Sequence, residues 1–462
     1  MPSRPDLWPA RMCRVGIVAP STRARRVLVE IAGIGTLEPD GPADERDTDR
    51  AGRPARGAGA VVPVLSRDPP GTDPAVDEED PRLLAGEASL TRRLECATER
   101  GRCTILPGWM RAADVDDARA AIEPYGGAVV ELPRRPGLLP PTAYTRHRAS
   151  AAFRPLVATY GTVPYADVDP TLFAAGAYVF MFGMMFGDVA HGAAIALLGV
   201  GALVARSGRL AGLRPLAWFL VSAGASAVVF GFLYGDCFGP TGLVPTLWIQ
   251  PLDEPAQFLV AGLLVGVVLL AGTFVLSIVD RWREGGAALA IYEPSGVAGG
   301  ALLIAVAAAG IALATSSDVA WWTAAAFAAL GTMLLFVGFV VRSGAGAAGI
   351  AQAFMELFDT VLRLGSNVIS FTRLAAFGLT HAVITDVVWQ GTTALWDRAG
   401  LFAVAAVALF VGGNVLAIAL GALVAAIQAL RLEYYELFSR LFTTSGRPFT
   451  PWHVDILPRE AS

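Results

Sequence analysis

The chain has 462 residues, of which 54% are hydrophobic and 16% are charged, and its mean hydropathy is +0.53. This composition is too apolar for an ordinary soluble protein and predicts an integral membrane protein. All 36 basic residues are arginine, and the formal net charge of -4 gives no reason to expect nucleic-acid binding. The four cysteines lie far apart, without the spacing of a metal or redox site, so we expect neither a metal nor a cofactor.

The first 165 residues hold most of the charge and much of the proline. Strand-like and helix-like patterns alternate there and predict a small α/β domain: CRVGIVAP (13–20), TRARRVLVEIAGIG (22–35), RCTILPGWM (102–110) and DVDDARAAIEPYG (114–126). The start of the chain lacks the continuous apolar core of a signal peptide, so we expect this domain to be cytoplasmic. Residues 38–82 are dense in Pro, Gly, Asp and Arg, which predicts a flexible insert.

Eight hydrophobic spans follow, at approximately 170–187, 189–206, 215–235, 256–280, 296–315, 320–341, 352–392 and 401–442. About 20 apolar residues cross a bilayer core, so the last two spans are long enough to tilt strongly or to extend beyond the membrane. The predicted fold class is a mainly α, polytopic membrane protein with an eight-helix membrane domain at residues 166–445. Residues 446–462 are predicted to form a cytoplasmic tail.

The charges of the loops orient the spans. With a cytoplasmic N-terminus, the arginine-bearing segments fall inside, at 206–214, 281–286, 342–349 and after Arg431. The acidic segments, 250–255 and 316–318, then fall outside. This arrangement agrees with the positive-inside tendency, and an even number of spans returns the C-terminus to the cytoplasm.

The seventh span carries a polar stripe. Six residues recur at steps of three and four: Arg363, Ser366, Ser370, Arg373, Phe377 and Thr380. His381 follows directly after the last of them. Lipid cannot satisfy polar groups, so the stripe must face protein or water. Arg373 is the most unusual member, because an arginine at the centre of a membrane helix costs roughly 2.5–3.5 kcal/mol to insert.

The eighth span shows a matching series. Asn414, Gly421 and Gln428 are spaced by sevens, and Arg431 lies one turn beyond Gln428. These groups are candidates for the lining of an ion path. For Ser370, Asn414 and Gln428, a role in bridging packed helices is an equal alternative.

A membrane arginine is suited to one particular task. It keeps its proton at any relevant pH, so it is not itself a proton relay. It can instead hold a passing carboxylate in its ionised form, so that a proton must leave the carboxylate by one half-channel and return by another. Residues 366–385 and 401–430 contain no carboxylate. We therefore expect the moving carboxylate to belong to another subunit.

Three membrane segments carry a family resemblance. SFTRLAAFGLTHAV (370–383) and IQALRLEYYELFSRLF (427–442) resemble the seventh and eighth membrane helices of the a subunit of V-type and A-type rotary ATPases, called subunit I in prokaryotes. MFGMMFGDVAHG (181–192) resembles the first membrane hairpin of that family, and YGTVPYADVDPT (160–171) resembles its membrane-entry segment.

The resemblance implies a non-catalytic stator subunit in a prokaryotic cell membrane, with ATP hydrolysed on other subunits. It places Arg373 opposite the carboxylate of a rotating proteolipid c-ring, with Arg431 facing the same ring. It implies that His381 lines a half-channel, although a hydrogen-bonded packing role is the alternative. The implied partners are the c-ring, the peripheral stalk, the V1/A1 catalytic head and the lipid bilayer. The ion is expected to be a proton, and the ring decides between H⁺ and Na⁺.

Other polar residues near the span ends have two interpretations each. Glu356, Asp359 and Glu433 are candidates for the cytoplasmic mouth of a half-channel, but acids at helix ends are often simply solvated. Asp188 and His191 lie three residues apart at a helix start, where a structural N-cap is favoured over an ion path.

Two departures from the family pattern leave alternatives open. The N-terminal part is short and no stretch sustains three or four heptads. The coiled-coil arm that binds the peripheral stalk in the family is therefore shortened, replaced by another chain, or absent. Eukaryotic-type members carry an acidic residue where this chain has Gly421. The alternatives are a secondary transporter built around Arg373 and His381, which would be expected to show internal repeats, and a membrane scaffold that no longer pumps.

Overall fold

The computed structural model describes residues 8–40, 61–69, 80–133, 138–143, 152–344, 346–398, 400–441 and 446–457. The insert predicted at 38–82 lies largely outside these residues. The chain forms two compact units, which are described separately. Unit 1 consists of Met1–Thr145, Gly161–Asp169 and Thr444–Ser462, and unit 2 consists of Arg146–Tyr160 and Pro170–Thr443.

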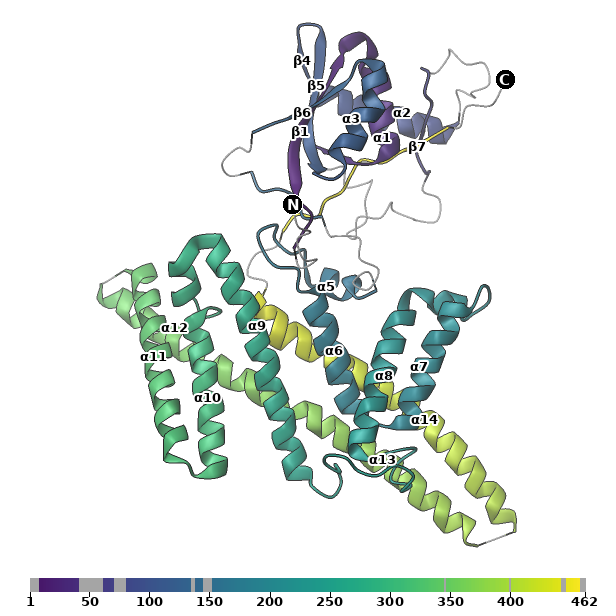
Figure 1. Cartoon of the computed structure of the whole chain (residues 1–462), viewed down its shortest axis with the longest axis vertical. Coiled ribbons are helices and arrows are strands. Elements are labelled where there is room, and N and C mark those ends of the chain that lie inside the picture. Colours follow the sequence, from purple (N-terminus) through teal and green to yellow (C-terminus); the bar gives the residue numbers. More distant parts are fainter. Residues whose placement is uncertain are drawn as a thin grey trace. The chain divides into compact units, whose positions relative to one another are not determined.

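Unit 1 contains an antiparallel sheet in the order β2-β5-β1-β6, with β4 paired to β5. Its strands are β1 (Met12–Pro20), β2 (Leu37–Pro39), β4 (Thr98–Arg100), β5 (Cys103–Arg111) and β6 (Ala128–Glu131). Helices α1 (Ala24–Ile34), α2 (Pro81–Glu95) and α3 (Val115–Ile122) complete the fold, and α1 and α3 lie side by side (Figure 1). The apolar positions of the strands and helices meet in one buried core that includes Val15, Leu28 and Leu106.

The C-terminal segment is part of unit 1. Strand β7 (Asp455–Ile456) pairs in parallel with β3 (Val64–Leu65), two residues that lie within the predicted insert. Trp452 and Val454 belong to the same buried core as β1 and α1, and the Trp452 indole N–H donates to Ser89 Oγ at 3.1 Å. The described residues of the tail therefore complete the N-terminal domain.

Unit 2 is helical. Its elements are α5 (Arg154–Tyr160), α6 (Thr171–Phe186), α7 (Val189–Val204), the 3-10 helix η3 (Ala211–Leu216), α8 (Ala217–Tyr234), α9 (Pro255–Tyr292), α10 (Val297–Thr315), α11 (Asp318–Ser343), α12 (Ala347–Ser370), α13 (Thr372–Trp396), α14 (Leu401–Leu432), the π-helix η4 (Glu433–Phe438) and α15 (Ser439–Leu441). Six helical segments of the described chain are long and apolar enough to cross a membrane, and α6 and α7 are shorter apolar helices. These eight segments correspond to the eight predicted spans, so the predicted fold class is confirmed.

Small residues bring the first helices of unit 2 together. A Cβ atom on Gly192 of α7 would lie 2.7 Å from the Val228 backbone nitrogen, and one on Gly224 of α8 would lie 2.5 Å from that of Ala196. Such close approach is typical of membrane helices packed through small residues. It fixes α7 against α8, and α7 carries His191.

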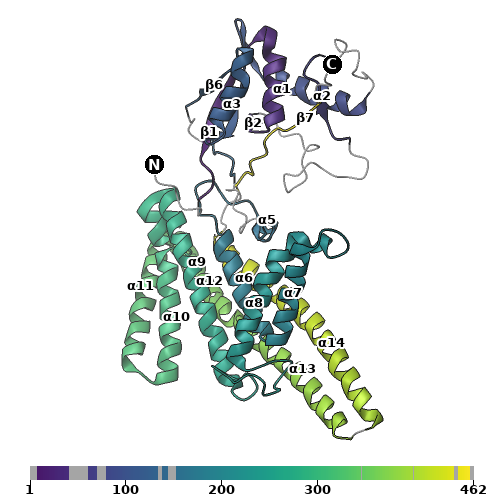
Figure 2. The ribbon, with the colours of Figure 1, turned by 45° about the vertical axis from the view of Figure 1, so that its right-hand side comes forward.

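The seventh span is two helices rather than one. Helix α12 ends at Ser370 and α13 begins at Thr372, with the buried Phe371 between them. Gly266 of α9 accommodates the Phe371 ring, because a Cβ atom at Gly266 would lie 2.3 Å from Phe371 Cγ. Arg373 therefore stands in the first turn of α13. Helices α13 and α14 run side by side, obliquely to α9 (Figure 2).

Candidate functional site

The Arg373 side chain forms two hydrogen bonds within the chain. Its Nε–H donates to the Ser370 carbonyl at 3.0 Å, and its Nη2–H donates to Glu436 Oε1 at 3.2 Å. The Arg373 side chain is 25% exposed, whereas that of Glu436 is only 7% exposed. The carboxylate is thus held inside the helix packing, and the guanidinium reaches from it toward the surface.

Asn367 and Arg440 extend this group, which we call the Arg373 cluster: Asn367, Arg373, Glu436 and Arg440. With its amide nitrogen toward Glu436, Asn367 donates to Glu436 Oε2 at 3.0 Å and accepts from Arg440 Nη2 at 3.2 Å. The Arg440 guanidinium also lies 4.9 Å from the centre of the Phe274 ring on α9. One carboxylate therefore serves two arginines, directly for Arg373 and through an amide for Arg440.

The sequence interpretation missed Glu436. It expected the counter-charge of Arg373 to come only from another subunit, yet Arg373 already has a carboxylate within the chain. Glu436 follows the apolar part of the eighth span, in the π-helical segment η4. Such π-helical turns are frequent at functional sites, but they cannot be recognised from residue spacing. The usable signal was the polar residues that accompany Arg431 in the same stretch.

Part of the polar stripe is left uncovered by the described chain. Ser366 and Thr380 are exposed, and the Arg363 side chain is 76% exposed and forms an ion pair with Asp359 at 2.7 Å. Arg431 of α14 is also exposed and forms no ion pair with any residue that the structure describes. The opposite side of α12 and α13 is buried, through Leu364, Val368 and Leu374 among others. Arg373 stands at the edge between these two sides.

A second buried group lies further along α13. We call it the His381 cluster: His191, His381 and Asn414, from α7, α13 and α14. His191 Nδ1 lies 3.4 Å from His381 Nε2, and His191 Nε2 lies 2.8 Å from Asn414 Oδ1. All three side chains are buried. Eight residues separate Arg373 from His381, which is about 12 Å along an α-helix, so the two clusters occupy different levels of the packing.

Asp188 holds the backbone beside the His381 cluster. It is the N-cap of α7, where Oδ1 accepts from the His191 backbone N–H at 2.9 Å, and Oδ2 accepts from that of Gly239 at 3.0 Å. This is the structural role that the sequence favoured. Asp236, in the loop after α8, lies nearby and is also buried. Burial, followed by the charges of Asp188 and Asp386, raises the pKa of Asp236 to about 7.

Gly421 allows His381 to take its position. A Cβ atom at Gly421 would lie 2.6 Å from His381 Nδ1, so no larger residue fits without displacing the ring. Phe186 also packs against His381, with its ring centre 4.5 Å from that of His381, and its Cε2 atom would lie 2.9 Å from the same Cβ atom at Gly421. Within the described chain, His381 Nδ1 is buried without a hydrogen-bond partner. The His381 ring therefore packs against both the Phe186 ring and the backbone of α14.

The remaining candidates fall outside both clusters. Glu356 accepts a hydrogen bond from Gln352 on the same helix at 2.9 Å, and Asp359 pairs with Arg363. Glu433 is fully buried, and its two carboxylate oxygens, like Gln428 Oε1, have no hydrogen-bond partner among the described residues. In the part of the chain that is described, no group of His, Cys, Asp and Glu side chains could hold a metal ion.

Comparisons with known proteins agree with the membrane motifs. The model of the V-type ATPase 116kDa subunit family matches residues 92–254. The chain is 25% identical to the A-type ATP synthase subunit I of Pyrococcus horikoshii over 365 aligned residues, covering 75% of this chain and 53% of the relative. The subunit I proteins of Aeropyrum pernix (26% identical, covering 77% and 58%) and Thermococcus kodakarensis (28%, covering 77% and 56%) are similar.

These matches confirm the family resemblance expected from the sequence. The chain spans about half the length of the curated relatives it matches. Together with its long apolar helices, the resemblance identifies a multi-pass membrane protein.

Proposed function

We propose, on the premise that this chain is a relative of the A-type ATP synthase subunit I proteins, that it is the stator a subunit (subunit I) of a rotary V/A-type ATPase. In this role it hydrolyses no ATP itself. It supplies the stationary half of the ion path, and a proteolipid ring that turns beside it supplies the mobile carboxylates. The ion we propose is the proton.

The uncovered polar face around Arg373 is the observation that carries the proposal. Arg363, Ser366 and Thr380 are exposed beside the half-buried Arg373, and Arg431 is exposed on α14. Hydrocarbon cannot satisfy such groups, so a polar or charged surface must cover them in the membrane. A ring of helices with acidic side chains has the charge that two arginines require.

Arg373 keeps a passing carboxylate ionised because it stays protonated at every relevant pH. A ring carboxylate that reaches Arg373 must give up its proton, and it can recover one only after it has moved on. When no ring carboxylate is opposite, Glu436 neutralises Arg373 from inside the chain. The guanidinium therefore exchanges one carboxylate partner for another and is never left alone in a medium of low polarity.

The two clusters suit two half-channels at different levels. In the predicted orientation, the Arg373 cluster lies on the cytoplasmic side of the His381 cluster. It is formed at the junction of α12 and α13 and just beyond the C-terminal end of α14, whereas His381 and Asn414 lie further toward the opposite ends of α13 and α14. Glu433 is a further candidate for the cytoplasmic side, because it is a buried carboxyl group without a hydrogen-bond partner in the described chain. Asp188 and Asp236 place acidic groups behind the His381 cluster on the other side.

The proposal implies particular partners and a location. The chain would lie in a prokaryotic cell membrane with both termini in the cytoplasm, beside the c-ring and beneath the V1/A1 head. Unit 1 is the part available to the peripheral stalk. It is a small α/β domain, in which the described residues form no long helical arm.

The decisive experiment replaces Arg373 in the complex purified from native membrane. We expect Arg373→Gln to abolish ATP-driven proton uptake into vesicles, with ring and head still assembled. Arg342→Gln is the matched control, because Arg342 pairs with Glu293 at the end of another helix. Undiminished uptake by Arg373→Gln would overturn the proposal. Solute uptake by the isolated chain would identify a secondary transporter, and a complex without ring or head would identify a scaffold.

A further inference from the structure

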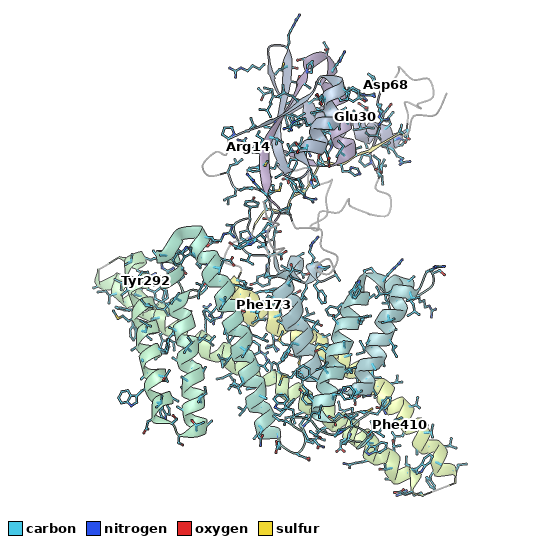
Figure 3. The ribbon with its side chains drawn as sticks, viewed as in Figure 1. Arg14, Glu30, Asp68, Phe173, Tyr292 and Phe410 are labelled. Atoms are coloured by element: carbon cyan, nitrogen blue, oxygen red, sulfur yellow. The ribbon has the colours of Figure 1, made fainter. Side chains whose placement is uncertain are left out.

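The Asn414 side chain determines which atoms of the His381 cluster donate hydrogen bonds and which accept them. Its amide nitrogen Nδ2 donates to the carbonyl of Phe410 at 2.7 Å. Phe410 lies on α14 and is labelled in Figure 3. The amide oxygen Oδ1 is therefore the atom that faces His191. An amide oxygen only accepts hydrogen bonds. His191 Nε2, 2.8 Å away, must carry a hydrogen and donate it to Asn414.

The tautomer of His191 in turn determines the tautomer of His381. A neutral imidazole has one N–H and one bare nitrogen, so a hydrogen on Nε2 leaves Nδ1 of His191 as an acceptor. The atom facing it at 3.4 Å is His381 Nε2, which completes this long hydrogen bond only if it carries a hydrogen. His381 then has its hydrogen on Nε2, and its Nδ1 is bare.

Other groups of the described chain do not compete for these ring nitrogens. Both oxygens of Asp188 are used by backbone N–H groups. The rings beside the two imidazoles belong to Phe186 and Phe238, which have no polar atoms. The bare Nδ1 of His381 lies against Gly421, where no side chain can fit between them.

We propose that Asn414 and His191 are positioning residues that hold His381 as its Nε2–H tautomer, so that Nδ1 is the atom that takes up and gives back a proton. The proton adds to the Nδ1 lone pair, which gives an imidazolium, and it leaves from the same atom. The tautomer follows from the distances alone. Its meaning for ion movement rests on the proposed function.

The same geometry closes one route. A proton passed from His381 to His191 Nδ1 has no onward acceptor, because Nε2 of His191 faces an amide oxygen of negligible basicity. It can only return to His381. A path on this side of the molecule therefore continues along α14, beside Gly421, and not through α7.

The tautomers can be read directly by nitrogen-15 NMR of histidine-labelled protein in lipid vesicles. The chain has only four histidines, so deleting one signal at a time with His191→Gln and His381→Gln assigns the spectrum. At alkaline pH, where imidazole is neutral, we expect both His191 and His381 to show a protonated Nε2 and a bare Nδ1. A protonated Nδ1 on His381 would overturn the proposal.

The variant Asn414→Leu tests whether Asn414 sets the tautomers of the two histidines. Without the acceptor oxygen, we expect an Nδ1–H signal to appear for both histidines. Asn414→Asp, which keeps an acceptor, and Gln390→Leu, which removes an exposed amide hydrogen-bonded to Asp386, should retain the original spectrum. Unchanged tautomers in Asn414→Leu would contradict the inference. If Asn414→Leu does not fold, the tautomers seen in the native protein and in Asn414→Asp test the inference. Because the spectra come from the isolated chain, they are independent of proton uptake by Arg373→Gln.

Discussion

At the scale of single residues, the contact between Arg373 and Glu436 combines a charged donor at the edge of the packing with a carboxylate inside it. A second ion pair on α12, between Arg363 and Asp359, has both side chains mostly exposed. Removing one partner of a partly buried pair such as Arg373–Glu436 lowers the stability of the fold more, because the remaining buried charge has no partner to compensate it. Exposed pairs at i,i+4 spacing contribute little.

This contrast gives a prediction for stability. In a double-mutant cycle with Arg373→Gln and Glu436→Gln, we expect a coupling free energy of about 1–3 kcal/mol, measured by thermal unfolding of the chain in detergent. The matched cycle with Arg363→Gln and Asp359→Asn should give a coupling of about 0.3–0.5 kcal/mol. Equal coupling in the two cycles would show that Glu436 does not hold Arg373.

At the scale of elements, the membrane helices were predictable because a run of apolar residues is a local property of the sequence. The division between α12 and α13 was not, since Phe371 continues the apolar pattern and its buried position depends on Gly266, more than 100 residues away. The candidate site was predictable in part. Arg373 could be recognised by the free energy needed to insert an arginine in a membrane, and His381 by its place next to the polar stripe. The contacts of His191 with Asn414 and of Glu436 with Arg373 could not, because they join residues from separate helices.

Gly266 offers a test of how Arg373 is positioned. In Gly266→Ala the new Cβ atom would lie 2.3 Å from the Phe371 ring, so the junction of α12 and α13 must move. We expect the free energy of unfolding to fall by about 1–3 kcal/mol, and proton uptake by the assembled complex to fall with it. Gly300→Ala is the control, because its Cβ atom would meet its nearest neighbour only at 4.0 Å. It should be neutral or slightly stabilising. A neutral Gly266→Ala would show that the junction adapts freely.

At the scale of the whole molecule, both ends of the chain contribute to one folded unit. Strand β7 pairs with β3 some 390 residues earlier, and Glu38 accepts from the Thr450 backbone N–H at 2.8 Å while it pairs with Arg447 at 2.9 Å. Sequence patterns could not reveal this, because β7 has two residues and its partner strand lies in a segment of low hydrophobicity. The α/β pattern identified the core of unit 1 but not the segment that completes it.

Trp452 carries the last prediction. It is 6% exposed in the core of unit 1, and its indole N–H is bonded to Ser89. Replacing a buried tryptophan with alanine costs about 3–5 kcal/mol. We expect Trp452→Ala to increase hydrogen exchange in α1, α2 and β1 while α6 to α8 keep their protection, because those helices have a separate core. Trp322→Ala, at a 77% exposed position of α11, should change neither unit. If protection were lost equally in both units, or in neither, the C-terminal segment would not be an integral part of unit 1.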